Sequence, residues 1–120
     1  MLTVIIFYRF SKRELKSRFE HAVDHNLEKV MEKIVKADCV IIDEISMISQ
    51  AVFEAFDAAC RAARKSAVFA GGLQVIVAGD FRQLPPVPND RYGDGGEYAF
   101  QSPQFKSAIR HHVDLTEVYR

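Results

Sequence analysis

Two acidic residues, Asp43 and Glu44, directly follow the apolar segment Val40-Ile41-Ile42. Ligands of open parallel sheets bind just outside the carboxyl ends of the strands, so two carboxylates in this position can share one chemical task. In nucleotide hydrolysis the first holds Mg²⁺, usually through bound water, and the second orients and deprotonates the attacking water. A pair of solvated acids at the end of a strand has the same pattern. Taken alone, the pair leaves both interpretations open.

A second polar cluster follows the apolar segment Leu73–Ala78 and reads Gly79-Asp80-Phe81-Arg82-Gln83-Leu84-Pro85-Pro86-Val87. Gly79 permits a sharp turn, and Pro85-Pro86 stiffens the exit, which helps to hold Gln83 in one place. A neutral amide there can bond a terminal phosphate oxygen or the attacking water. The alternative for Gln83 is a polar loop residue. Both clusters are expected at the same edge of a sheet.

Three apolar segments, Leu2–Tyr8, Val40–Ile42 and Leu73–Ala78, predict buried strands. Apolar residues at helical spacing predict one long helix from Ser11 past Ile34 and a second from Ser49 to Lys65. Strands that alternate with helices indicate βαβ units, an α/β fold and a parallel sheet flanked by helices. We also expect an irregular loop over Phe81–Tyr98, a short helix around Pro103–Ile109 and a strand around His112–Leu115.

Length and composition limit the function classes. The chain has 120 residues, enough for one domain, and 16 basic residues balance 16 acidic ones, so no global attraction to nucleic acid or membranes is implied. A hydrophobic fraction of 48% argues against intrinsic disorder. The longest apolar run, Val4–Tyr8, is far shorter than the ~20 residues of a membrane-spanning helix. We expect an intracellular protein with reduced thiols.

The two cysteines and one basic cluster favour structural roles. Cys39 and Cys60 have no metal-ligand spacing and are predicted to be thiols in the core. Arg61, Arg64 and Lys65 lie at a predicted helix C-terminus, where positive charge suits the helix dipole. Contact of this cluster with DNA phosphates is the less favoured alternative.

Together, Asp43-Glu44-Ile45-Ser46-Met47 and the segment from Gly79 to Val87 resemble the petite-integration-frequency (Pif) family of superfamily-one DNA helicases. The ending Leu115-Thr116-Glu117-Val118-Tyr119-Arg120 looks like the next motif of that family. The resemblance covers residues 37–120 as part of a helicase domain, whereas residues 1–36 show only a generic strand and helix. Ser46 and Met47 are expected to pack or cap.

The resemblance implies a partial RecA-like fold of the P-loop NTPase type. It implies ATP as substrate, Mg²⁺ as cofactor and single-stranded DNA as partner, with movement from 5′ to 3′. Asp43 would bind Mg²⁺, Glu44 would be the catalytic base, Gln83 would sense the γ-phosphate and Arg120 would contact that phosphate. Such helicases serve telomere maintenance, DNA repair and recombination. The expected location is the nucleus or mitochondrion of a eukaryote, or otherwise the cytoplasm.

One family feature, the glycine-rich phosphate loop, has no counterpart before the acidic pair, because no glycine precedes Gly71. The second RecA-like domain of the family, expected beyond Arg120, is also missing from these residues. We therefore expect a fragment of the first motor domain that alone neither hydrolyses ATP nor unwinds DNA. The alternative is a non-catalytic RecA-like remnant that binds a protein or DNA.

Overall fold

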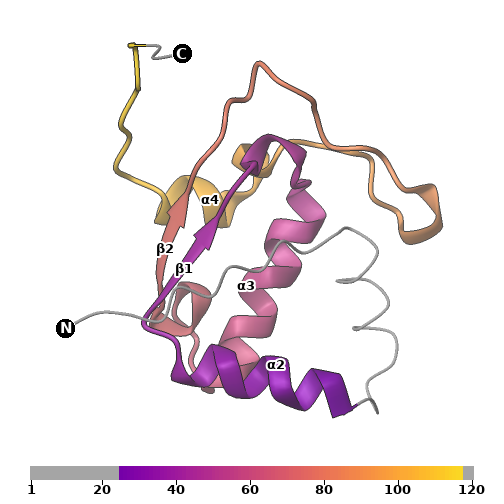
Figure 1. Cartoon of the computed structure of the whole chain (residues 1–120). Coiled ribbons are helices and arrows are strands. Elements are labelled where there is room, and N and C mark those ends of the chain that lie inside the picture. Colours follow the sequence, from indigo (N-terminus) through magenta and orange to yellow (C-terminus); the bar gives the residue numbers. More distant parts are fainter. Residues whose placement is uncertain (1–24, 118–120) are drawn as a thin grey trace.

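The computed structural model describes residues 25–117, with side chains from residue 29 onward (Figure 1). The predicted strand Leu2–Tyr8, the beginning of the first predicted helix and Arg120 lie outside the described residues. The helices are α2 (His25–Lys36), α3 (Gln50–Arg64) and α4 (Pro103–Ala108), and the strands are β1 (Cys39–Ile42) and β2 (Gln74–Val77). Short 3₁₀ turns join them: η1 (Ile45–Met47), η2 (Phe69–Gly72), η3 (Asp90–Tyr92) and η4 (Ala99–Gln101).

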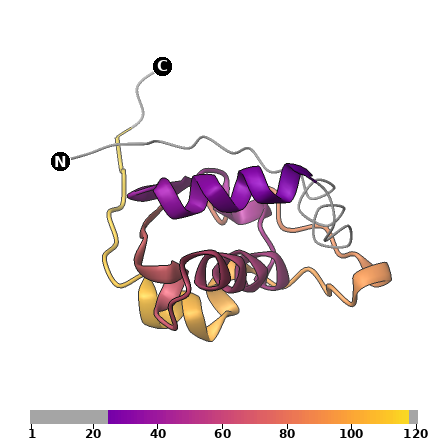
Figure 2. The ribbon, with the colours of Figure 1, turned by 90° about the horizontal axis from the view of Figure 1, so that it is seen from below.

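The strands β1 and β2 pair in parallel, as predicted, with Val40 opposite Val75 and Ile42 opposite Val77. These four side chains pack against two small hydrophobic clusters. Parallel strands need a crossover connection, and α3 supplies it. Figure 2 shows α2 and α4 on opposite sides of α3. The predicted α/β class with a parallel sheet and flanking helices is confirmed.

The crossover helix α3 agrees closely with the prediction of a helix from Ser49 to Lys65. Ser49 caps its beginning, since the Ser49 side chain accepts a hydrogen bond from the Val52 N–H, and Lys65 ends it in a left-handed conformation. Phe53 and Cys60 on this helix are fully buried, and for Cys60 this confirms the predicted core thiol. The Phe53 ring lies against three other phenylalanine rings, those of Phe56, Phe69 and Phe105.

Two of the basic residues at the end of α3, Arg61 and Arg64, donate hydrogen bonds to carbonyl groups. Arg64 Nη1 donates to the carbonyl oxygens of Ile34 and Val35 at 3.1 and 3.0 Å and of Ala37 at 3.1 Å, and Arg64 Nε donates to Gly71 O at 2.8 Å. Arg64 therefore holds the end of α2 and the approach to β2 together. The partners lie outside α3, which the helix-dipole argument did not indicate.

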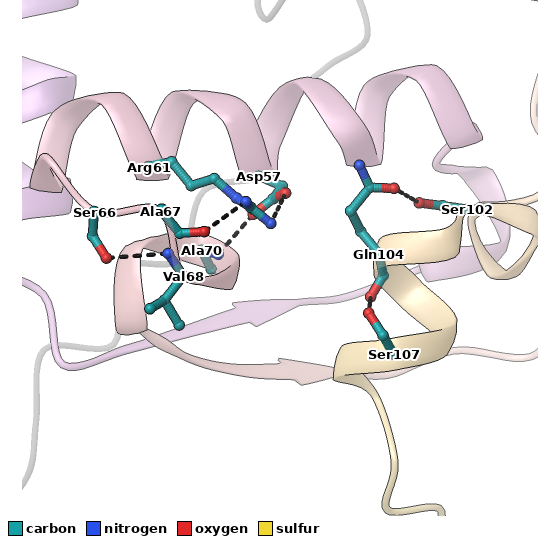
Figure 3. A network of polar contacts seen from close by, with 9 residues as sticks. All are labelled: Asp57, Arg61, Ser66, Ala67, Val68, Ala70, Ser102, Gln104 and Ser107. Carbon is teal, nitrogen blue, oxygen red and sulfur yellow. Dashed lines mark hydrogen bonds and ion pairs between the residues drawn. The ribbon is translucent and has the colours of Figure 1, made fainter.

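A second polar network surrounds the buried carboxylate of Asp57 (Figure 3). Asp57 Oδ1 accepts from the Ala70 N–H at 2.7 Å and from Arg61 Nε at 2.9 Å, and Arg61 Nη2 lies 2.9 Å from Asp57 Oδ2. Arg61 Nη1 also donates to Ala67 O at 2.7 Å. The network fixes the turn between α3 and β2 to the helix.

The loop before α4 is irregular apart from the short turns η3 and η4, and the predicted helix near Pro103 corresponds to α4. The predicted strand over His112–Leu115 is wrong. Its alternating Val113 and Leu115 are 84% and 91% exposed and pair with no strand in the described part of the chain. Alternation alone cannot make a strand without a neighbour to accept its backbone hydrogen bonds. Across residues 25–117, none of the helices has the length and apolar character needed to cross a membrane.

Candidate functional site

The acidic pair lies at the carboxyl end of β1, where the chain turns sharply. Glu44 adopts a left-handed backbone conformation, with φ 56° and ψ 45°, that residues other than glycine rarely take. The turn is supported by Asp43, whose Oδ1 accepts from the Glu44 N–H at 2.8 Å. Both residues are exposed, and η1 begins directly after them. The carboxylates are thus presented to solvent from a defined backbone.

The end of β2 lies directly beside this turn. Ile45 N donates to Ala78 O at 3.0 Å, and Ala78 N donates to Ile42 O at 2.9 Å, so parallel pairing continues past both named strands. Gly79 approaches so closely that a Cβ atom built on it would lie 2.9 Å from Ile45 N. The structure therefore brings the two polar clusters to one edge of the sheet.

The loop after Gly79 folds back on itself around Asp80. Its Oδ1 accepts from the backbone N–H of Arg82 at 2.9 Å and from Arg82 Nε at 3.0 Å, while Asp80 O accepts from the Gln83 N–H at 3.0 Å. The bond from the Arg82 side chain, followed by that from its backbone N–H, lowers the pKa of Asp80. Asp80 in turn raises the pKa of Arg82.

The Gln83 side-chain amide is available to a ligand. The residue is exposed, and its amide has no hydrogen-bond partner within residues 25–117. An amide with free donors and a free acceptor, held on a folded turn, can form hydrogen bonds with a phosphate oxygen or a water molecule. The structure does not describe Arg120, so it does not relate that residue to this edge.

Aromatic residues that the sequence analysis did not single out anchor the loop. Phe81 meets the Phe100 ring edge-on, with centroids 4.9 Å apart, and the Tyr98 ring at 5.9 Å. Tyr98 and Phe100 stack on each other at 5.0 Å. Further along the loop, Pro86 is buried. Little in the sequence indicated these contacts, because Tyr98 and Phe100 are separated by one residue, as in any alternating pattern.

A buried carboxylate, Asp94, was also missed. Its Oδ2 accepts from Ser49 Oγ at 2.8 Å and its Oδ1 accepts from the Gly96 N–H at 3.0 Å. Because Ser49 also caps α3, Asp94 ties the long loop to the start of that helix. The sequence predicted only an irregular loop for this segment.

The two remaining residues of the acidic motif differ in exposure. Ser46 is buried, and its hydroxyl has no hydrogen-bond partner among the described residues. Met47 is 47% exposed. Ser46 therefore packs but caps nothing within residues 25–117.

The metal-binding capacity of this edge is limited to isolated carboxylates. No group of three His, Cys, Asp or Glu side chains within residues 25–117 could hold a metal ion together. Asp43 is exposed, and no hydrogen bond to its Oδ2 is found within the described residues, so this oxygen can bind a cation that is coordinated mainly by other ligands. This fits Mg²⁺ that arrives with nucleotide phosphates and water.

Comparison with known proteins agrees with the two motifs at this edge. A family model described as PIF1-like helicase matches residues 16–120. The chain belongs to the PIF1-like helicase family. The ATP-dependent DNA helicase PIF1 of Danio rerio is 41% identical over 81 residues, which is 68% of this chain, and the Homo sapiens protein of the same name is 38% identical over 81 residues. The chain spans about 12% of the length of each of these two relatives.

Solved PIF1-family structures share the fold. The Pif1 helicase from Candida albicans matches 92% of this chain and 23% of its own chain, with a TM-score of 0.69 and 25% identity. A Bacteroides Pif1 bound to single-stranded DNA matches 83% of this chain and 21% of its own, with a TM-score of 0.55 and 27% identity. The fold of this chain is thus a part of the RecA-like fold of Pif1 helicases.

Proposed function

We propose that this chain forms the ATP-hydrolysing edge of the first motor domain of a PIF1-like DNA helicase. One observation carries the proposal: two loops from neighbouring parallel strands lie side by side and present Asp43, Glu44 and Gln83 to solvent. A parallel sheet binds its ligands at this edge, and phosphoryl transfer requires this set of groups. Family membership supports the same activity.

Each residue has a proposed role. Asp43 would bind Mg²⁺, which, when present with ATP, neutralises phosphate charge. Glu44 would orient the attacking water and accept its proton. Gln83 would bond the γ-phosphate or that water, and Arg120 would contact the same phosphate.

The wider activity follows from the relatives. They are named ATP-dependent DNA helicases, and two solved Bacteroides structures contain single-stranded DNA or ADP-AlF4. We propose that the protein acts on single-stranded DNA in the 5′ to 3′ direction, in telomere maintenance, repair and recombination. The corresponding location is the nucleus or mitochondrion of a eukaryotic cell, or else the cytoplasm.

We further propose that these 120 residues alone do not hydrolyse ATP. The phosphate loop needs glycines with unusual dihedral angles, and no glycine precedes Gly71. The purified chain is expected to show no DNA-stimulated ATPase activity. An activity that disappears with Glu44→Gln would contradict this proposal.

The decisive experiment uses a polypeptide extended on both sides according to the gene sequence. An in-frame Gly-Lys-Thr segment upstream would supply the phosphate loop. In that protein, Glu44→Gln should lower the kcat of DNA-stimulated ATP hydrolysis by about 100-fold or more while nucleotide affinity stays nearly constant. Glu54→Gln is the matched control, because Glu54 lies on α3 and, among residues 25–117, its carboxylate accepts only from Gln50 Nε2. Equal rates for the two variants would refute the role of Glu44.

A second candidate, a non-catalytic binding module, is favoured by the exposed apolar side chains of Ile76, Leu84 and Val113. Such side chains mark association surfaces when they cluster. Calorimetric titration of the chain with Mg²⁺ and ATP separates the candidates. Metal-dependent binding that Asp43→Asn abolishes supports the nucleotide site, and absence of heat supports the binding module.

A further inference from the structure

We propose that Gly79 is a positioning residue for Glu44, because its missing side chain lets the end of β2 close over the Glu44–Ile45 peptide. The inference rests on the proposed function, in which Glu44 activates water. It concerns a residue that touches neither nucleotide nor water in that scheme and acts only through the backbone of Glu44.

The contact that carries the inference is between backbones. A Cβ atom on residue 79 would lie 2.9 Å from Ile45 N, 3.1 Å from Ile45 Cγ2 and 3.5 Å from the Glu44 carbonyl carbon. The first distance is shorter than any normal van der Waals contact. A side chain could swing away, but Ile45 N is fixed by its bond to Ala78 O at 3.0 Å, and the Ile45 side chain is 2% exposed. Any residue other than glycine would therefore separate the two loops.

Separation would act first on Glu44. Its left-handed conformation is unfavourable for a residue with a Cβ atom and persists only where neighbouring contacts enforce it. Three hydrogen bonds hold this turn: Glu44 N donates to Asp43 Oδ1, Ile45 N donates to Ala78 O, and Met47 N donates to Glu44 O. Loss of the second would free Glu44 to return to an ordinary conformation, which would turn its carboxylate in a new direction.

The same contact links the two motifs. Gly79 is followed by the turn that carries Gln83, since Gln83 N donates to Asp80 O. With Gly79 seated against Ile45, the turn and the acidic pair form one unit. A displacement of Gln83 would then be transmitted to Glu44.

The test is NMR spectroscopy of the full 120-residue chain with Gly79→Ala and two control variants. Gly72→Ala and Gly93→Ala also replace glycines with positive φ, 85° and 64°, but an added Cβ there meets no atom within 4 Å. The readouts are hydrogen exchange of the Ile45 amide and the intraresidue HN–Hα NOE of Glu44, which is strong in the left-handed region.

With Gly79→Ala, Ile45 exchange is expected to accelerate about tenfold or more, the effect of one lost hydrogen bond, and the Glu44 NOE should weaken. Both controls should leave these signals unchanged, although they destabilise the chain through strain. Unchanged Ile45 and Glu44 signals in Gly79→Ala would overturn the inference. If that variant does not fold, the test is made on the wild-type chain. An NOE between Gly79 Hα and Ile45 HN together with a left-handed Glu44 supports the inference, and the absence of either one overturns it.

The outcome is independent of the catalytic proposal. The NMR signals report the contact between loops, whereas the Glu44→Gln ATPase measurement reports the chemistry. Loss of ATPase with Glu44→Gln alongside unaltered Glu44 signals in Gly79→Ala would reject only the positioning role. Altered signals alongside full ATPase in Glu44→Gln would reject only the catalytic role.

Discussion

The polar side chains at the two ends of the small sheet differ in whether they are hydrogen-bonded within the protein. At the end where the strands begin, hydrogen bonds within the protein occupy the polar side chains of Asp57, Arg61 and Arg64. Asp57 and Arg61 bond each other, and all three bond carbonyl or amide groups of the turns. At the end where the strands finish, the Glu44 carboxylate and the Gln83 amide make no hydrogen bond within residues 25–117.

This difference separates polar residues that build the fold from those available to a ligand. A buried polar group must find a partner inside the protein, because an unpaired one is costly. An exposed side chain on a strained backbone, such as that of Glu44, contributes no such bond to the fold. The energetic cost of the backbone strain therefore points to a functional role. Substitutions that remove the bonded polar groups of the first end should destabilise the fold, whereas replacing the Glu44 carboxylate with an amide at the second end should leave stability nearly unchanged.

The largest effect on stability is expected from ionisation of the Cys60 thiol, which is buried near Asp57. Burial, with a smaller contribution from Asp57, raises its pKa from 9.0 to about 12. The unfolded thiol ionises first, so its contribution is complete below pH 9 and is lost as pH rises toward 12. The free energy of unfolding should fall by about 1.4 kcal/mol per pH unit in this window. Urea denaturation at several pH values measures it.

Substitution of the other cysteine, Cys39, provides the control for this experiment. Cys39 is partly exposed, so Cys39→Ala should keep the alkaline slope. Cys60→Ala should remove most of it. The same slope in both variants would show that another group is responsible.

Asp57→Ala should give the next largest effect. It leaves the Ala70 N–H without its acceptor and Arg61 without its ion-pair partner. Asp57 is buried whereas Arg61 is partly exposed, and loss of the buried acceptor predicts a decrease of about 3 kcal/mol in the free energy of unfolding. Chemical denaturation tests this, with exposed Asp90→Ala as control. A change below that of the control would mean that the network is dispensable.

Arg64→Lys should cost about 1 to 2 kcal/mol although the charge is kept. One guanidinium reaches four carbonyl oxygens, and the smaller ammonium group lacks this fork of donors. Thermal unfolding followed by circular dichroism is suitable. Lys106→Ala on the exposed face of α4 should stay within about 0.5 kcal/mol. Full stability of Arg64→Lys would show that charge alone suffices.

Substitutions of two serines that lie three residues apart should differ by a smaller amount in the free energy of unfolding. Ser49→Ala removes the cap of α3 and the bond to Asp94, which predicts a loss of about 1 to 2 kcal/mol. Ser46→Ala removes a buried hydroxyl without a partner in the described chain, so stability should be unchanged or slightly higher. Denaturant midpoints compare the two directly. A destabilised Ser46→Ala would indicate a partner outside residues 25–117.

The smallest effects belong to Glu44. Glu44→Gln should leave the free energy of unfolding within about 0.5 kcal/mol, because no bond to its carboxylate is found in residues 25–117. Glu44→Gly should raise it by about 0.5 to 1 kcal/mol, since glycine takes the left-handed conformation without strain. Differential scanning calorimetry resolves such changes. A destabilised glycine variant would mean that the glutamate side chain supports the fold.

Much of the fold could be predicted from local patterns. Helix α3 has apolar spacing and a serine cap, and β1 and β2 are short apolar segments between helices, so each was found close to its true bounds. The strand over His112–Leu115 could not be judged locally, because pairing depends on a neighbour that the described chain does not offer. Asp94 and the ring contacts of Phe81 were missed because their partners are distant in sequence.

By itself the sequence determined the residue types at the ends of two strands, and with them the family. Their order along the chain is a covalent property and needs no coordinates. Tertiary structure decided that Gly79 seats against Ile45, that Glu44 bends into the left-handed region, and that Arg64 binds carbonyls of two other segments. These features arise from close approach between segments far apart in the chain, which no local propensity encodes.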